Sequence, residues 1–272
     1  SGAARTWISF DSGRITRLLS DINLSRVRAQ IAPELEKLNL SGLSGRIEFS
    51  EDEGGMHFRA DRLVFQHGLN GSRFGPATIT ADCAKNVADD VSSCNFMASE
   101  VSIGTLAKIA SSLPLPHDAL DFLSERPISG ILQEASASFH SDYKNPSNWS
   151  FAGVFRGITV PPGEDRLPGI RNLSGSVRTD TPGEFDITLD MHYGALYFPG
   201  VFRNPQLNVT SLTGRVKASI HSEVNLTFED IKVANDDLAA RAEGSWKNSG
   251  GAGSIDISGS VERGIGTSVI KY

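Results

Sequence analysis

The sequence has little of the chemistry that most enzymes need. It holds six histidines in 272 residues, and none stands at a helical or hairpin spacing from a second metal ligand. The G-x-S-x-G, G-x-G-x-x-G and P-loop motifs are all absent. The paired acids Asp89-Asp90 and Asp236-Asp237 stand among residues typical of turns. These absences predict a protein that is not an enzyme and that uses neither a metal nor a cofactor.

Long apolar runs and basic patches are missing as well. No stretch of about 18 apolar residues occurs, so the sequence predicts no transmembrane helix. A charged leader followed by an apolar segment is also absent, so no signal peptide is visible. The net charge of −6, with no basic stripe between aromatic residues, argues against a nucleic-acid partner.

Cysteine is rare, and the two that occur are close in sequence. Cys83 and Cys94 lie in the polar segment ADCAKNVADDVSSC, which has no CxxC spacing and no histidine. Two interpretations remain open: a disulfide that closes a small loop between two strands, or two free thiols. The first is favoured, and it implies an oxidising compartment.

What the sequence does contain is a short phrase that returns. Leu43-Ser44-Gly45-Arg46-Ile47 has near copies at residues 173–177, 212–216 and 257–261. Each copy opens or crosses a stretch of alternating apolar and polar residues, which predicts a β-strand. The glycine marks a place where another backbone or a bend comes close.

Strict alternation predicts strands with one apolar and one wet face. In the first half it predicts a hairpin, with Ile47 and Phe49 before an acidic turn at residues 51–55 and Met56, Phe58 and Ala60 after it. The second half is predicted to be almost entirely β, with alternating runs at residues 184–192, 223–228 and 254–258.

Helical signals are few. Leu106, Ile109, Ala110 and Leu113 share one face of a helix that prolines end, and a second short helix is predicted at residues 119–123. We also expect a short helix after Ser25. The predicted organisation is a strand or short helical segment at 1–37, a β-region with a helical insert near 103–125 at 38–165, and a second β-region at 166–272 that continues the same sheet.

More than a dozen amphipathic strands must hide their apolar faces behind a second sheet, behind helices, or by curling. With one helical region available, we predict a mainly β fold: an elongated, twisted antiparallel sheet curled into an apolar groove that suits acyl chains. The side chains predicted to face this groove are Phe49, Met56, Phe58, Phe185, Ile187, Leu189, Val224, Leu226 and Phe228.

Several short motifs also follow one another in an order that resembles the order in a known protein family. They are LPLP at 113–116, RPISGIL at 126–132, Trp149 with Gly153 and Phe155, PG followed by LSG within 168–175, VF-x-x-P at 201–205, LTGRV at 212–216, and the stretch 234–246. In this order the chain resembles YhdP-type proteins of the AsmA-like superfamily over roughly residues 38–272. The cysteine loop at 83–94 is a departure from that family.

The resemblance implies a Gram-negative envelope protein in the periplasm, held to the inner membrane by an anchor that we expect outside these residues. Such proteins are bridge-like conduits whose partners are phospholipid acyl chains. The function predicted is therefore phospholipid transfer between inner and outer membranes in support of outer-membrane integrity. The alternative is a closed, non-catalytic β-scaffold for protein interactions in the envelope. A carbohydrate-active β-solenoid would need two convergent carboxylates, and the sequence offers no such pair.

Overall fold

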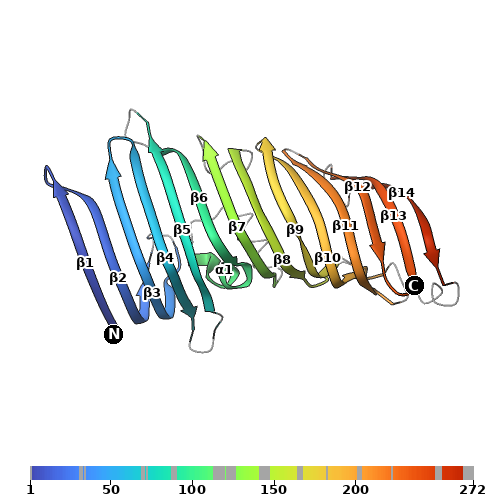
Figure 1. Ribbon diagram of the computed structural model, residues 1–272, viewed down its shortest axis with the longest axis horizontal. Coiled ribbons are helices and arrows are strands. Elements are labelled where there is room, and N and C mark those ends of the chain that lie inside the picture. Colours follow the sequence, from blue (N-terminus) through green and yellow to red (C-terminus); the bar gives the residue numbers. More distant parts are fainter. Residues whose placement is uncertain are drawn as a thin grey trace. The chain divides into compact units, whose positions relative to one another are not determined.

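Antiparallel strands that follow one another in the sequence make up the computed structural model (Figure 1). The structure describes all of the chain except residues 1, 31, 32, 34, 69, 70, 72, 87–90, 113–119, 121–126, 141–147, 164–167, 182, 201–203, 222, 249–252 and 266–272. Within the described residues, fourteen strands form one sheet whose spatial order is the order of the sequence, with β1 and β14 at its two edges. The predicted mainly β, antiparallel class is confirmed.

The first seven strands contain the predicted hairpin. They are β1 (Gly2–Asp11), β2 (Arg14–Ala29), β3 (Leu38–Asp52), β4 (Gly55–His67), β5 (Arg73–Lys85), β6 (Val91–Ser102) and β7 (Ser129–His140). The turn between β3 and β4 forms where the acidic residues meet two glycines. There Asp52 Oδ1 accepts hydrogen bonds from the amides of Gly54 and Gly55 at 2.8 and 3.2 Å.

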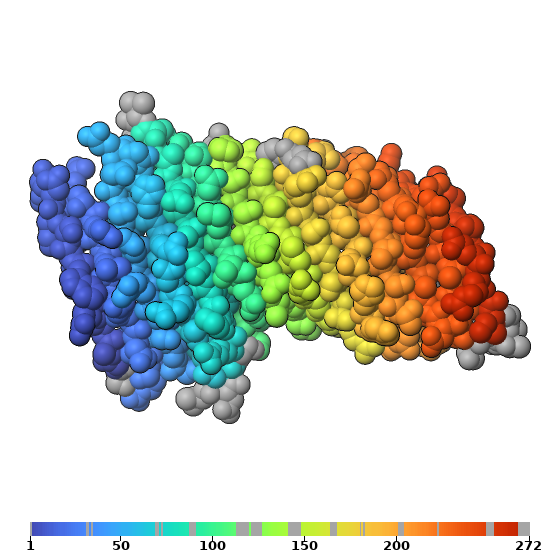
Figure 2. Space-filling view, in the orientation of Figure 1, coloured from blue at the N-terminus to red at the C-terminus, as the bar shows by residue number. Residues whose placement is uncertain are grey.

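The remaining seven strands come from the half that was predicted to be almost entirely β. They are β8 (Trp149–Val160), β9 (Gly169–Thr181), β10 (Glu184–Tyr197), β11 (Gln206–Ile220), β12 (Val224–Ala234), β13 (Leu238–Asn248) and β14 (Ser254–Gly264). Figure 2 shows side chains of successive strands packed in bands that follow the sequence.

One predicted helix is confirmed and another is wrong. The helix α1 (Ile103–Ile109) and the 3-10 turn η1 (Ala110–Ser112) form the helical insert, and the second helix predicted at 119–123 falls almost wholly outside the described residues. No helix follows Ser25, because β2 continues to Ala29 and Val27 pairs with Leu40 of β3. Val27 packs against the apolar core there, so burial of its side chain overrides the weak helical spacing.

The chain divides into two units. Unit 1 comprises residues 1–125 and 132–149, and unit 2 comprises 126–131 and 150–272. The segmentation into 1–37, 38–165 and 166–272 stays a prediction. Each unit has a buried core: Leu40, Phe65, Phe74, Ala77 and Ile109 in unit 1, and Met191, Val209 and Leu212 in unit 2.

The recurring glycine has a structural role that the sequence only hinted at. Gly45 and Gly214 have φ angles of 149° and 144°. Each lies where the neighbouring strand bulges around a residue with positive φ, Arg62 in β4 or Asp230 in β12. A Cβ atom on Gly214 would stand 2.7 Å from Ile231 Cδ1 and 2.9 Å from the Asp230 carbonyl oxygen. The glycine therefore allows the bulge to come close.

Candidate functional site

A row of apolar side chains crosses unit 1 at right angles to its strands. Leu18, Phe49, Phe58, Ala81 and Phe96 occupy directly opposite positions on β2, β3, β4, β5 and β6. Residues directly opposite one another on antiparallel strands project from the same face. The predicted groove residues Phe49 and Phe58 are thus neighbours within one row that spans five strands.

Aromatic stacking extends this row. The ring of Phe96 lies 6.3 Å from Phe139 on β7 and 6.1 Å from Trp149 at the start of β8, between ring centroids. Phe139 and Trp149 are 5.1 Å apart. We name the set Leu18, Phe49, Phe58, Ala81, Phe96, Phe139 and Trp149 the aromatic row.

The third predicted residue of unit 1 lies on the same face, one row further along the strands. Met56 is opposite Glu51 on β3 and Cys83 on β5. Glu51 accepts a hydrogen bond from Lys85 Nζ at 2.5 Å, and the Lys85 side chain is largely buried. The apolar face therefore ends in an ion pair at this end of the strands.

Helix α1 covers the other end of this face. Ile109 of the helix packs with Leu40, Phe65 and Phe74, whose side chains are buried. Phe49 and Phe58 lie outside that cluster and remain partly exposed. The helix thus closes part of the apolar face of unit 1 and leaves the region of the aromatic row partly accessible.

Unit 2 repeats the arrangement. Phe185, Ala218, Leu226, Trp246 and Ile255 are directly opposite one another across β10 to β14. The next row joins Val177, Ile187, Val216 and Phe228 in the same way. Alternation along the strands places the remaining predicted residues, Leu189 and Val224, on this face as well.

All nine predicted groove residues are partly buried, and the pairing places each on the apolar face of its unit. Whether they contact lipid stays a prediction. Sequence reasoning missed Leu18, Phe96, Phe139, Trp149 and Trp246. Phe96 is followed by Met97, which is exposed on the opposite face, so the local alternation is blurred there.

The opposite face of unit 1 is lined with ion pairs. Arg46 donates two hydrogen bonds to Asp21 at 2.6 and 2.9 Å, and Arg59 does the same to Asp61 at 2.9 and 2.7 Å. These hydrogen bonds lower the pKa of both carboxyl groups. Because the partners are exposed and water screens their charges, each pair contributes little to stability. This face is therefore the solvent-exposed, polar face of unit 1.

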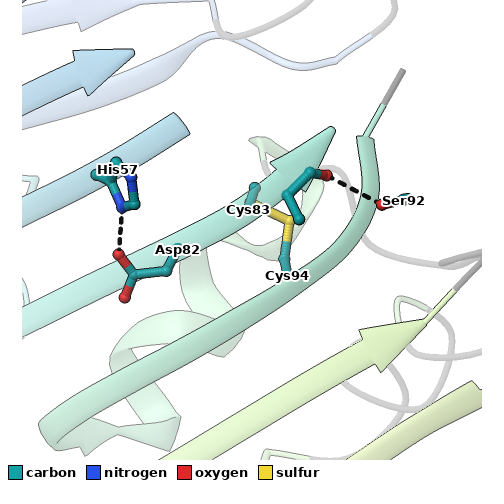
Figure 3. Close-up of a disulfide and its surroundings, with 6 residues drawn as sticks. His57, Asp82, Cys83, Ser92 and Cys94 are labelled. Atoms are coloured by element: carbon teal, nitrogen blue, oxygen red, sulfur yellow. Dashed lines mark hydrogen bonds and ion pairs between the residues drawn. A yellow bond between two sulfur atoms is a disulfide. The ribbon is translucent and has the colours of Figure 1, made fainter. Parts of the chain in front are cut away.

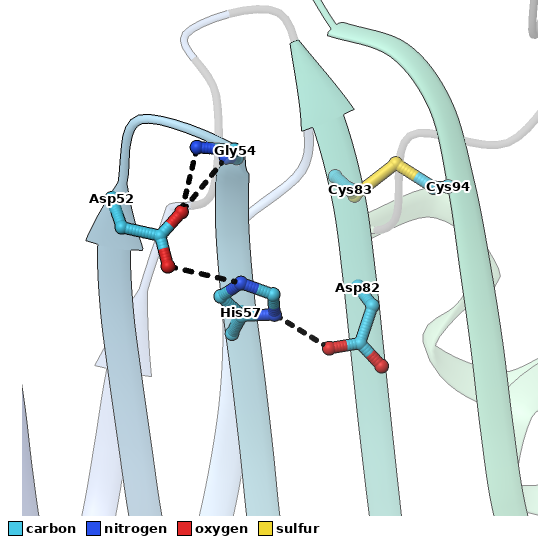
Figure 4. A network of polar contacts seen from close by, with 7 residues as sticks. Asp52, Gly54, His57, Asp82, Cys83 and Cys94 are labelled. Carbon is cyan, nitrogen blue, oxygen red and sulfur yellow. Dashed lines mark hydrogen bonds and ion pairs between the residues drawn. A yellow bond between two sulfur atoms is a disulfide. The ribbon is translucent and has the colours of Figure 1, made fainter.

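His57 belongs to the polar face and lies between two acids (Figure 4). Its Nδ1 is 2.7 Å from Asp82 Oδ1, and its Nε2 is 3.7 Å from Asp52 Oδ2. The hydrogen bond to Asp82 raises the pKa of His57. Desolvation of the ring opposes this rise, and the charge of Asp52 adds to it. Among the described residues, no three His, Cys, Asp or Glu side chains are arranged to hold a metal ion.

A disulfide joins Cys83 of β5 to Cys94 of β6 (Figure 3). The two residues are directly opposite, with Cα atoms 4.0 Å apart, and they belong to the apolar face beside Met56. Ser92 Oγ donates to the carbonyl oxygen of Ala84 at 3.3 Å nearby. The disulfide therefore fixes the β5–β6 pair at the end of the apolar face.

The described helical residues include no segment with the length and hydrophobicity that crossing a membrane requires. Comparison with curated proteins and with solved structures finds no match. Comparison with protein families finds one that matches the chain over residues 1–272, described as YhdP protein. The match covers the whole sequence, and the chain belongs to the YhdP protein family.

Proposed function

We propose that this chain is a periplasmic segment of a bridge-like lipid transfer protein. It conducts phospholipid between the inner and outer membranes and so supports outer-membrane integrity. Acyl chains lie along the apolar faces described above, while headgroups stay at the rim in water. The protein acts by binding and guiding lipid rather than by catalysis.

One observation carries the proposal: the members of the aromatic row other than the buried Phe139 are partly exposed, and the row belongs to a one-layer sheet. All fourteen described strands belong to that sheet, so none of them supplies a second sheet to cover the row. A closed sandwich, the alternative architecture, requires such a layer. An apolar row of this kind needs an apolar occupant.

Acyl chains fit the energetics of this surface. Each CH₂ removed from water contributes about 0.8 kcal/mol. The row from Leu18 to Phe96 contains no polar side chain at its five positions, so no hydrogen bond holds an acyl chain at one place. Binding that is distributed in this way allows a lipid to slide from strand to strand. The ion pair of Glu51 and Lys85 lies where the apolar face ends and a headgroup would meet water.

Two further findings support the setting. Membership of the YhdP family favours a role in lipid transport. The disulfide between Cys83 and Cys94 fits an oxidising compartment such as the periplasm. Two parts of the proposal rest on the family resemblance. They are the anchor in the inner membrane and the connection between the inner and outer membranes.

The three tryptophans provide a direct test. Trp149 and Trp246 lie on the apolar faces, whereas Trp7 is opposite Leu19 on the polar face. Phospholipid with brominated acyl chains quenches fluorescence only of an indole that it contacts. We expect quenching in single-tryptophan variants that retain Trp149 or Trp246, and little in the variant that retains Trp7.

The chain purified without detergent should also carry phospholipid, visible by native mass spectrometry and lipid extraction. A lipid-free mass after incubation with phospholipid vesicles, together with equal quenching of all three tryptophans, contradicts the proposal. That result would favour the protein-interaction scaffold.

A further inference from the structure

One ion pair of unit 1 belongs to the apolar face. Glu51 is directly opposite Met56, whose other neighbour across the sheet is Cys83. Lys85 follows Cys83 by two residues on β5, so alternation places it on the same face. Its Nζ donates a hydrogen bond to Glu51 Oε1 at 2.5 Å. The pair therefore lies among apolar side chains rather than on the polar face.

Lys85 differs from other paired cations in its burial. Its side chain is 13% exposed and that of Glu51 is 38% exposed. In seven other ion pairs the lysine or arginine side chain is 50–57% exposed, as it is for Arg17 beside Glu48. A charge withdrawn from water in this way needs a partner of opposite charge. A ligand that displaces one member of the pair therefore has to supply the same charge to the other.

The pair lies beside the surface proposed for acyl chains. Glu51 is two residues beyond Phe49 on β3, which is roughly 7 Å along the strand. Because β4 lies between β3 and β5, the contact of Lys85 with Glu51 spans the start of β4. A phospholipid with its acyl chains on the aromatic row can thus place its polar end next to both charges.

Both members of the pair are held in place by neighbouring structure. Glu51 precedes Asp52, whose carboxylate accepts the amide hydrogen bonds that fix the hairpin turn (Figure 4). Lys85 is two residues from the disulfide that joins β5 to β6. Positions that are already fixed reduce the ordering that binding a ligand requires.

The two charges distinguish between headgroups. Lys85 can bind the single negative charge of a phosphate diester in place of the Glu51 carboxylate. Glu51 then needs a cation, and a primary ammonium supplies both positive charge and N–H donors. The quaternary ammonium of choline has the charge but no N–H, and a glycerol headgroup has no positive charge.

We propose that Glu51 and Lys85 form a binding site for phospholipid headgroups that join a phosphate to a primary ammonium, as in phosphatidylethanolamine. Lys85 binds the phosphate and Glu51 binds the ammonium. One ion pair is exchanged for two, so neither side chain is left without an opposite charge. The site rests on the proposed function, and it adds selection by headgroup to a surface whose acyl contacts do not distinguish lipid classes.

The experiment titrates the chain with three phospholipids that share the same fluorescent acyl chains: phosphatidylethanolamine, phosphatidylcholine and phosphatidylglycerol. The wild type should bind phosphatidylethanolamine about tenfold more tightly than the other two, which is the effect of one hydrogen bond between charged groups. Glu51→Gln removes the negative charge and should bind all three lipids with similar affinity. Lys85→Met removes the phosphate contact and should bind all three more weakly than the wild type.

Glu48→Gln is the matched control, because it breaks the exposed ion pair with Arg17 on the polar face of the same strand. It should keep the wild-type preference for phosphatidylethanolamine. Far-ultraviolet circular dichroism checks that each variant is folded. If Lys85→Met fails to fold, the comparison of Glu51→Gln with Glu48→Gln still decides the proposal.

The outcomes separate this inference from the proposed function. A wild type that binds the three lipids equally overturns the inference and leaves the proposed function standing, whereas a wild type that binds none of them overturns both. A preference that survives in Glu51→Gln, or that is lost in Glu48→Gln, also overturns the inference. Glycerophosphoethanolamine carries the same charged groups without acyl chains and should bind far more weakly than the lipid. Equal affinity for it overturns the inference, because the site then serves a soluble phosphate compound.

Discussion

Phe49 of β3 and Phe58 of β4 occupy directly opposite positions on either side of the hairpin turn, on the apolar face of unit 1. Both rings are partly exposed. The residues next to them, Ser50 and His57, are also opposite each other but belong to the polar face. One hairpin therefore provides a matched pair of positions for testing which face binds lipid.

Phe49→Asp should weaken binding of phospholipid about tenfold or more. The change removes contact with at least two CH₂ groups, at about 0.8 kcal/mol each, and places a charge beside the acyl chain. Titration with a fluorescent phospholipid measures the effect. The control Ser50→Asp adds the same charge one residue away, beside His57 and opposite Arg17, and should bind as the wild type does. Equal losses in both variants would refute the assignment of faces.

In unit 2 the same comparison uses adjacent residues of β12. Leu226 lies between Ala218 and Trp246 on the apolar face, whereas Thr227 lies between Lys217 and Ser245 on the polar face. Leu226→Asp should reduce lipid binding and the quenching of Trp246 by brominated acyl chains. Thr227→Asp should change neither. If only the unit 1 variant loses binding, the apolar face of unit 2 is not a lipid surface.

Much of the fold could be predicted because apolar and polar residues alternate along an amphipathic strand. The hairpin around residues 51–55 and the placement of Ile187 and Phe228 on one face follow from period-2 patterns that the pairing respects. The helix at Ile103 was predicted for a similar reason, since its apolar residues share one face.

What could not be predicted depends on contacts between distant strands. Val27 looked helical from its four-residue spacing, yet its partner in β3 is 13 residues away and fixes it in a strand. Trp149 joins the aromatic row through Phe139 and Phe96, and no local pattern reports that stacking. The bulges at Arg62 and Asp230 also could not be predicted from the sequence, although the glycines opposite them belong to the recurring phrase.

Those glycines make a prediction about stability. Gly214→Ala should lower the free energy of unfolding by about 1–3 kcal/mol, because alanine tolerates the φ of 144° poorly and its Cβ would press on Ile231. Urea denaturation measures the change. Gly42→Ala is the control, since a Cβ there meets nothing within 4 Å, and its effect should stay within about 0.5 kcal/mol. Similar losses in both would mean that the bulge does not require glycine.

The disulfide should stabilise the β5–β6 pair by lowering the conformational entropy of the unfolded chain. Cys83 and Cys94 are 11 residues apart, so the loop-entropy estimate is up to about 3 kcal/mol. The double variant Cys83→Ala, Cys94→Ala should unfold at lower urea than the oxidised wild type. Reductant should shift the wild type toward the variant and leave the variant unchanged. A variant as stable as the oxidised protein would show that the strand pairing alone holds this segment.

The contact between His57 and Asp82 predicts a dependence of stability on pH. The hydrogen bond to Asp82 raises the pKa of His57 above its ordinary value of 6.5. The protonated form is favoured in the folded state, so this stabilisation is fully present below pH 6.5 and is lost as the pH rises through the folded pKa. Asp82→Asn should lower the pKa of His57 in an NMR titration. It should also destabilise the protein at about pH 5.5 more than at about pH 8.5. A difference between wild type and variant that is the same at both pH values would contradict this, because it would mean that Asp82 acts independently of the charge on His57.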